Sequence, residues 1–129
     1  MIVLPSLETG GTERQVVLLV EGLVKLDSSW LDRLEIVVMR SSGVLESELP
    51  SGVKLTSLGV SNFYDPRALR RLRQAMVRSA PSVVYSLLAP ANVVAGLACT
   101  GLDVALVWGH RSQTLAAATG GCVEALRRC

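Results

Sequence analysis

The chain is poor in the residues that most often carry metal, redox and aromatic-stacking chemistry. Its 129 residues include one histidine, three cysteines, one phenylalanine, two tryptophans and two tyrosines. A single histidine cannot build a histidine-based metal site, and Cys99, Cys122 and Cys129 lack the spacing of zinc ligands. We therefore expect neither a metal nor a cofactor.

The chain also lacks a strong charge imbalance and any long apolar run. Its formal net charge is only +2, which does not favour nucleic-acid binding. No apolar run reaches the length of a membrane span, and the first residues lack the basic segment of a signal peptide. In a helical tail, Cys122 and Cys129 would lie roughly 10 Å apart, too far for a disulfide. These features predict a cytoplasmic protein with reduced thiols.

What the chain does contain is apolar sequence in alternating strand and helix patterns. Half of its residues are hydrophobic and 19% are charged, which suits one domain spanning residues 1–129. Strands are predicted over residues 2–5, 34–39, 53–58, 83–86 and 105–108, and helices over 12–26, 66–80, 90–99 and the remainder to Cys129. This alternation predicts a doubly wound parallel sheet of five strands in the order 3-2-1-4-5, within a three-layer α/β/α architecture.

The loop after the first predicted strand is the most informative segment. Gly10 and Gly11 precede a predicted helix, so bare backbone N–H groups at a free helix N-terminus would face a ligand. Thr12 and Gln15 have the spacing of a capping box, which predicts that the helix starts at Thr12. Glu13 adds negative charge, so the loop is not purely an anion trap. The structural alternative is an ordinary tight connection between a strand and a helix.

Known phosphate-binding motifs are absent from this loop. No Gly-Lys-Ser/Thr sequence follows it, which excludes a P-loop, and the six-residue dinucleotide fingerprint is missing. The segment from Thr9 to Thr12 partly matches the phosphate loop of flavodoxins, but Leu7 stands where that loop needs a hydroxyl. Few aromatic residues are present to flank a flavin.

His110 and Arg111 follow the fifth predicted strand. In the predicted strand order, ligands bind at the carboxyl ends of the strands, at the switch point between the first and fourth strands. The glycine loop and His110 should therefore meet at one edge of the sheet. His110 would orient a substrate hydroxyl or contact a sugar, and Arg111 would pair with a phosphate. The alternatives are a histidine bonded to backbone and an ordinary surface cation.

A basic face is predicted on the third helix. It consists of five arginines, namely Arg67, Arg70, Arg71, Arg73 and Arg78. Such a face is usually solvated, and the functional alternatives are contact with an anionic membrane surface or with an acidic partner.

The order and spacing of these segments resemble the N-terminal domain of the family-4 glycosyltransferases, which are retaining, nucleotide-sugar-dependent enzymes with two Rossmann-like domains. The segments that carry the resemblance are 4–14, 43–53, 80–86, 91–92 and 107–111. The resemblance implies that Gly10 and Gly11, with Thr12 and Glu13, lie near the donor diphosphate and the acceptor. It also implies that His110 contacts the transferred sugar, with Arg111 beside it. Tyr85 and Leu87 depart from the family, whose members often carry histidines there.

The resemblance implies that a full-length parent transfers a sugar from a nucleotide sugar to an acceptor. The second domain of that family supplies most nucleotide binding and is absent from these 129 residues. We therefore expect this chain to be a fragment of a larger protein and to be inactive alone, because catalysis by positioning needs both walls of the site.

Two further expectations follow. Missing strands should leave one sheet edge unpaired, and unpaired edges invite association, so we expect a homodimer formed through that edge or the final helix. The alternative to an enzyme fragment is a non-catalytic Rossmann-like or flavodoxin-like binding or interaction module.

Overall fold

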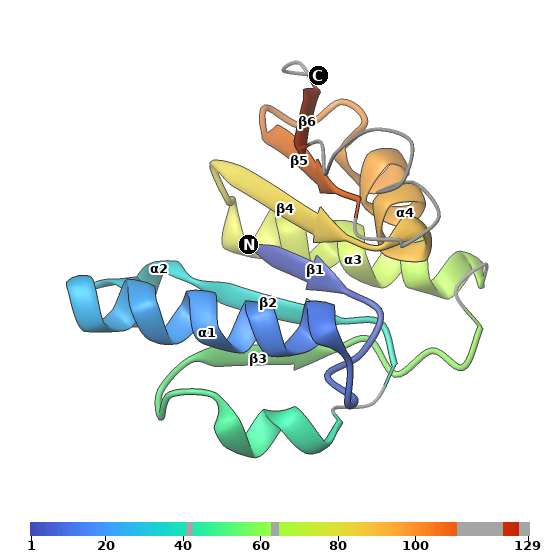
Figure 1. Cartoon of the computed structure of the whole chain (residues 1–129). Helices are drawn as coiled ribbons and strands as arrows, with labels where there is room; N and C mark the ends of the chain where they lie inside the picture. The colour runs from blue at the N-terminus through green and yellow to red at the C-terminus, as the bar shows by residue number, and fades with distance from the viewer. Residues whose placement is uncertain (41–42, 63–64, 111–122, 127–129) are drawn as a thin grey trace.

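The computed structural model describes residues 1–40, 43–62, 65–110 and 123–126. Its strands are β1 (Ile2–Leu4), β2 (Glu35–Val38), β3 (Lys54–Ser57), β4 (Val83–Leu87), β5 (Ala105–Gly109) and β6 (Val123–Leu126). Its helices are α1 (Gly11–Leu26), α2 (Trp30–Arg33), α3 (Pro66–Ser79) and α4 (Ala89–Cys99), with a 3₁₀ segment η1 (Val44–Glu48). Strand and helix alternate along the chain as predicted (Figure 1).

The strands form a single sheet in the order β3-β2-β1-β4-β5-β6. The first five strands are all parallel, so the predicted order 3-2-1-4-5 and the Rossmann-like α/β fold are confirmed. The sixth strand was not predicted. It runs antiparallel to β5, with Gly109 opposite Val123 and Leu106 opposite Leu126.

The strand β6 corrects the expectation of a helical tail. The tail was predicted to be helical to Cys129, yet residues 123–126 are extended because their backbone groups pair with those of β5. The outer side of β5 is therefore covered rather than left open. Among the described residues, the sheet ends at β3 on one side and β6 on the other.

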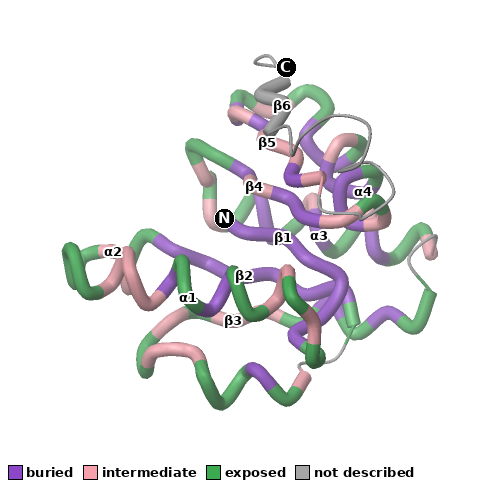
Figure 2. Tube along the Cα trace, in the orientation of Figure 1, coloured by how far each residue is buried: buried purple, intermediate pink, exposed green. Residues whose placement is uncertain are grey.

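The core explains why the central strands are mostly apolar. Every residue of β1 and β2 is buried, as a parallel strand covered on both faces requires (Figure 2). Alternate residues enter two clusters, so that Val3 and Val37 pack beneath α3 and α4 whereas Leu4 and Val38 pack beneath α1. The two helical layers thus lie on opposite faces of the sheet (Figure 1).

The start of α3 is fixed by a side-chain cap and a proline. Asp65 is the N-cap of α3, its carboxylate accepts the Arg67 backbone N–H at 2.8 Å, and Pro66 occupies the first turn. The helix ends at Ser79, where Ala80 adopts a left-handed conformation with φ of 42° before Pro81.

The start of α1 contradicts the predicted capping box. The N-cap is Gly10 rather than Thr12, and no side-chain hydrogen bond caps the helix there. Thr12 lies inside the first turn, so Thr12 and Gln15 do not form a capping box. The helix begins one residue earlier than the spacing predicts.

Candidate functional site at the carboxyl edge of the sheet

Three segments meet where β1, β4 and β5 end. The loop from Pro5 to Gly10 leads into α1, the turn at Leu88 leads into α4, and His110 follows β5. The Leu88 backbone N–H donates to the Gly109 carbonyl at 3.2 Å, which joins the ends of β4 and β5. The predicted loop and His110 therefore share this edge, at the point where the strand order reverses.

The two glycines of the loop have different surroundings. A Cβ added at Gly10 would overlap the carboxylate of Glu13, whereas a Cβ at Gly11 would have no neighbour within 4 Å. The Glu13 carboxylate is thus folded back over the first turn of α1, where the helix dipole stabilises negative charge. This part of the N-terminus already faces an anionic group of the chain itself, while Gly11 is exposed.

A hollow of about 240 Å³ lies beside the first two turns of α1. Thr12 and Gln15 from α1 and Tyr85 from β4 carry the polar groups of its lining, and Val16, Leu19 and Leu87 form the apolar part. Gly109 forms a close boundary, because a Cβ there would lie 2.6 Å from Leu87 Cδ2 and 3.1 Å from the Tyr85 hydroxyl oxygen. A hydroxyl, an amide and a phenol therefore surround one small space.

His110 follows Gly109 in the sequence, but its side chain does not line the hollow. Its ring is edge-on to the Trp108 ring, with 6.2 Å between ring centroids. Trp108 packs into the cluster beneath α4 and lies against Gly96, where a Cβ would be 3.2 Å from its ring. Within the described residues the Trp108 indole N–H is buried without a hydrogen-bond partner. Arg111, predicted to pair with a phosphate, lies outside the described residues.

The turn between β4 and α4 adds two features that the sequence analysis missed. Leu88 has a φ of 71°, a left-handed conformation that is costly for a leucine. The buried Ser86 hydroxyl donates to Asn92 Oδ1 at 2.8 Å, and the Asn92 amide nitrogen is buried without a partner among the described residues. Strained backbone and unsatisfied polar atoms concentrate at functional edges, but no local sequence pattern identifies a strained leucine.

The opposite edge of the sheet is tied together by a buried carboxylate. Glu35 accepts the Thr56 hydroxyl at 2.8 Å and the Ser79 hydroxyl in a short bond, and it pairs with Lys54 Nζ at 3.2 Å. Arg78 lies 3.7 Å from it. Burial raises the pKa of Glu35, but the hydrogen bonds from Ser79, Thr56 and Lys54 and the Lys54 charge outweigh burial, so its pKa lies below the usual value.

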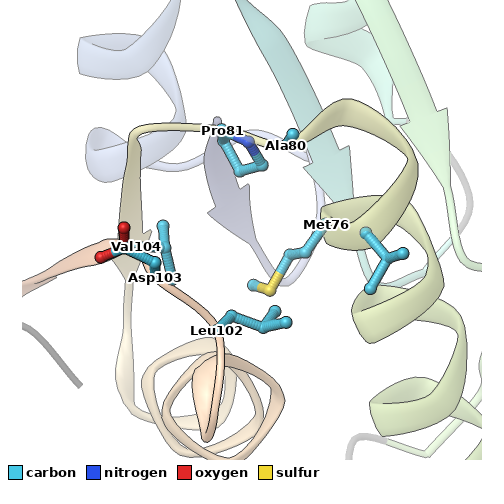
Figure 3. Close-up of a pocket in the computed structure, with 7 residues that line it drawn as sticks. Met76, Ala80, Pro81, Leu102, Asp103 and Val104 are labelled. Carbon is cyan, nitrogen blue, oxygen red and sulfur yellow. The ribbon is translucent and has the colours of Figure 1, made fainter.

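An apolar cavity of about 250 Å³ also opens at this opposite edge. Met76 and Leu102 face one another across it, and its wall also includes Val77, Ala80, Pro81, Asp103 and Val104 (Figure 3). These residues come from the C-terminal end of α3 and the turns that precede β4 and β5. The cavity is therefore remote from the glycine loop and His110.

The arginines of α3 do not form one uniform basic face. Arg73 donates to the carbonyl oxygens of Ala98 and Thr100, at 2.8 and 2.7 Å, and so caps the C-terminus of α4. Arg71 donates to the Leu58 carbonyl in a short bond. Arg67 and Arg70 are exposed near the start of α3.

No protein-family model matches the chain, and no curated protein gives a significant match. In the part of the chain that the structure describes, no helix is long and apolar enough to cross a membrane. The same residues include no group of three or more histidine, cysteine or acidic side chains placed to hold a metal ion. Cys99 is buried, and the other two cysteines lie outside the described residues.

Proposed function

We propose that this chain forms the acceptor-side wall of a nucleotide-sugar-dependent glycosyltransferase site. The observation that carries the proposal is the polar hollow beside α1, which adjoins the glycine loop and Gly109 at the switch point of the sheet. Thr12, Gln15 and Tyr85 offer hydroxyl, amide and phenol groups, which match the hydroxyl groups of a sugar. The resemblance of the loop and of the β5 end to the family-4 glycosyltransferases agrees with this ligand class.

The position of Glu13 favours a hydroxylated ligand over a phosphate on this wall. Its carboxylate lies over Gly10 at the N-terminus of α1, so a phosphate approaching there would meet a like charge. A sugar hydroxyl, in contrast, can donate to a carboxylate. In this proposal Gly11 lets the acceptor approach the backbone, and His110 orients the transferred sugar from the end of β5.

The second wall of the site would come from a donor-binding domain. Positioning two reactants contributes a large part of the rate enhancement in reactions of two substrates, and one wall positions only one of them. We therefore expect the isolated chain to bind acceptor sugars weakly and to leave nucleotide sugars unchanged. Enzyme-level hydrolysis of a nucleotide sugar by the chain alone would contradict this part of the proposal.

Binding is tested by titrating the isotope-labelled chain with methyl glycosides while backbone amide signals are followed by NMR. Amide signals of residues 10–15, at the start of α1, and of Leu87, Gly109 and His110, at the ends of β4 and β5, should shift together. Gln15→Ala should weaken the response, and Gln74→Ala, the same change on α3 away from the hollow, should not. Shifts confined to another face, or binding of flavin mononucleotide at the loop with no response to sugars, would refute the proposal. The second result would support the flavodoxin-like alternative.

A further inference from the structure

A polar groove runs between the edge strand β3 and the helix α3. It has a volume of about 230 Å³, and its α3 wall carries Arg71, Gln74 and Arg78. These three residues are spaced by three and four positions, so they lie in one row along the helix. The β3 wall consists of Thr56, Ser57 and Leu58, with the Thr56 side chain on the α3 face of the strand. This groove lies away from the hollow beside α1 and takes no part in the function proposed above.

The charge of the groove is positive. Arg71 and Arg78 line it, Lys54 lies beside its Arg78 end through their shared partner Glu35, and the single Glu35 carboxylate offsets only one of these three charges. Arg71 is held by one bond to the Leu58 carbonyl and Arg78 by its pairing with Glu35, so each guanidinium is positioned yet keeps further N–H donors for a ligand. An anionic occupant is therefore favoured.

The two arginines stand at opposite ends of β3. Arg71 contacts Leu58, just past the carboxyl end of the strand, and Arg78 contacts Glu35, which pairs with Lys54 at the amino end. They lie seven positions apart along the helix, a rise of about 10 Å. One phosphate group is too small to bridge that span, whereas an extended segment with two or more acidic side chains matches it.

The backbone of β3 also offers hydrogen-bonding groups to an extended segment. The Leu58 backbone N–H donates to the Val38 carbonyl at 2.8 Å. In the parallel ladder the backbone N–H and C=O groups of Lys54 and Thr56 therefore also point toward β2, and those of Leu55 and Ser57 point outward. Among the described residues no strand pairs with this outer side. An edge strand with free backbone groups accepts an additional strand.

The two faces of β3 indicate which side chains an added strand should carry on each of its own faces. Lys54 and Thr56 lie on the α3 face, toward the basic groove, whereas Leu55 packs with Leu49 and Val53 in the cluster beneath α1. We infer that β3 and its groove bind an extended partner segment with alternating acidic and apolar residues, which adds to the sheet beside β3. The acidic side chains lie over Arg71 and Arg78, and the apolar ones lie beside Leu55.

The inference is tested with the whole chain and a blocked peptide of about six alternating valine and glutamate residues. Calorimetry should detect binding that weakens as salt is raised, and the same peptide with lysine in place of glutamate should bind about tenfold more weakly or not at all. Arg71→Gln with Arg78→Gln should lower the affinity about tenfold. Arg67→Gln with Arg70→Gln removes the same charge from the same helix outside the groove and should change it less than about threefold.

Backbone pairing is tested with the unaltered protein, so the result does not depend on variants that fold poorly. Two peptides are N-methylated at alternate residues, one at the odd and one at the even positions. Methylation of the set that faces β3 should abolish binding, and methylation of the other set should leave it intact. Equal binding of both methylated peptides, equal loss in both arginine pairs, or competition by inorganic phosphate as strong as by the peptide would overturn the inference. The last result would indicate a site for small anions.

Discussion

The sheet is stabilised differently at its amino edge, where the strands begin, and at its carboxyl edge, where they end. At the amino edge, Glu35 collects hydroxyl and ammonium donors from β3 and α3. At the carboxyl edge, backbone and glycine set the geometry, with Leu88 in a left-handed conformation and Gly109 packed too closely for a side chain. The amino edge is thus held by a network of side-chain hydrogen bonds, whereas the carboxyl edge combines strained backbone with close packing, a combination that is common at functional sites.

Cavity size does not separate these two edges. The apolar cavity at the amino edge and the polar hollow at the carboxyl edge have nearly equal volumes, about 250 and 240 Å³. Of the two, only the hollow has converging polar side chains, and it lies beside the first turn of α1. The chemistry of the lining, rather than its volume, therefore identifies the candidate site.

The largest expected effect comes from removing Glu35. Glu35→Ala deprives Thr56, Ser79 and Lys54 of their acceptor, and three lost hydrogen bonds should lower the free energy of unfolding by about 3 kcal/mol. Urea denaturation at neutral pH measures this change. The sugar response at the carboxyl edge should persist in the folded fraction. If that response vanished as well, the two edges would not be independent.

Gly109→Ala should produce a smaller loss of stability with a large loss of binding. The new methyl group would press on Leu87 and the Tyr85 hydroxyl, and such overpacking costs about 1–2 kcal/mol. Because the same two side chains line the hollow, the NMR response to sugars should disappear. Gly101→Ala, at a glycine with a φ of 73° and no close neighbour, is the control: it should cost stability by strain and leave sugar binding intact.

The pH dependence of stability should arise at the amino edge. The Glu35 pKa is lowered on folding, so its contribution is complete above the unfolded value of about 4.3 and is lost as pH falls through the lower folded value. The free energy of unfolding of the unaltered protein should therefore decline as pH falls below about 4.3. That of Glu35→Gln should decline less over the same pH range. Denaturation curves at several pH values compare the two. Parallel curves would show that other carboxyl groups dominate.

The sequence predicted the parallel strands but not the elements whose structure depends on tertiary pairing. The five parallel strands were located to within one or two residues, because runs such as Leu34–Met39 are apolar, β-branched and bounded by polar turns. The strand β6 was missed because Val-Glu-Ala-Leu suits a helix as well as a strand, and pairing with β5 decides between them. The short elements α2 and η1 carry too few residues for a periodic pattern.

Prediction of the site was similarly divided. Topology alone brought the glycine loop and His110 to one edge, since every parallel strand ends there. The roles of Tyr85 and Leu87 in the hollow depend on α1 packing over β4, a tertiary contact that spacing does not encode. The capping prediction was wrong because it considered only Thr12 and Gln15, whereas the Glu13 carboxylate occupies the helix N-terminus.

The smallest expected effect separates the two glycines of the loop. Gly10→Ala would displace the Glu13 carboxylate from the first turn of α1 and should cost about 0.5 kcal/mol. Gly11→Ala meets no neighbour and replaces a helical glycine, so it should stabilise the chain by about 0.5 kcal/mol. If Gly11 serves as the backbone surface for an acceptor, that more stable variant should nevertheless bind sugars more weakly. Thermal unfolding and the NMR titration, measured on both variants, show whether stability and binding separate at a single residue; binding that follows stability in both would remove Gly11 from the site.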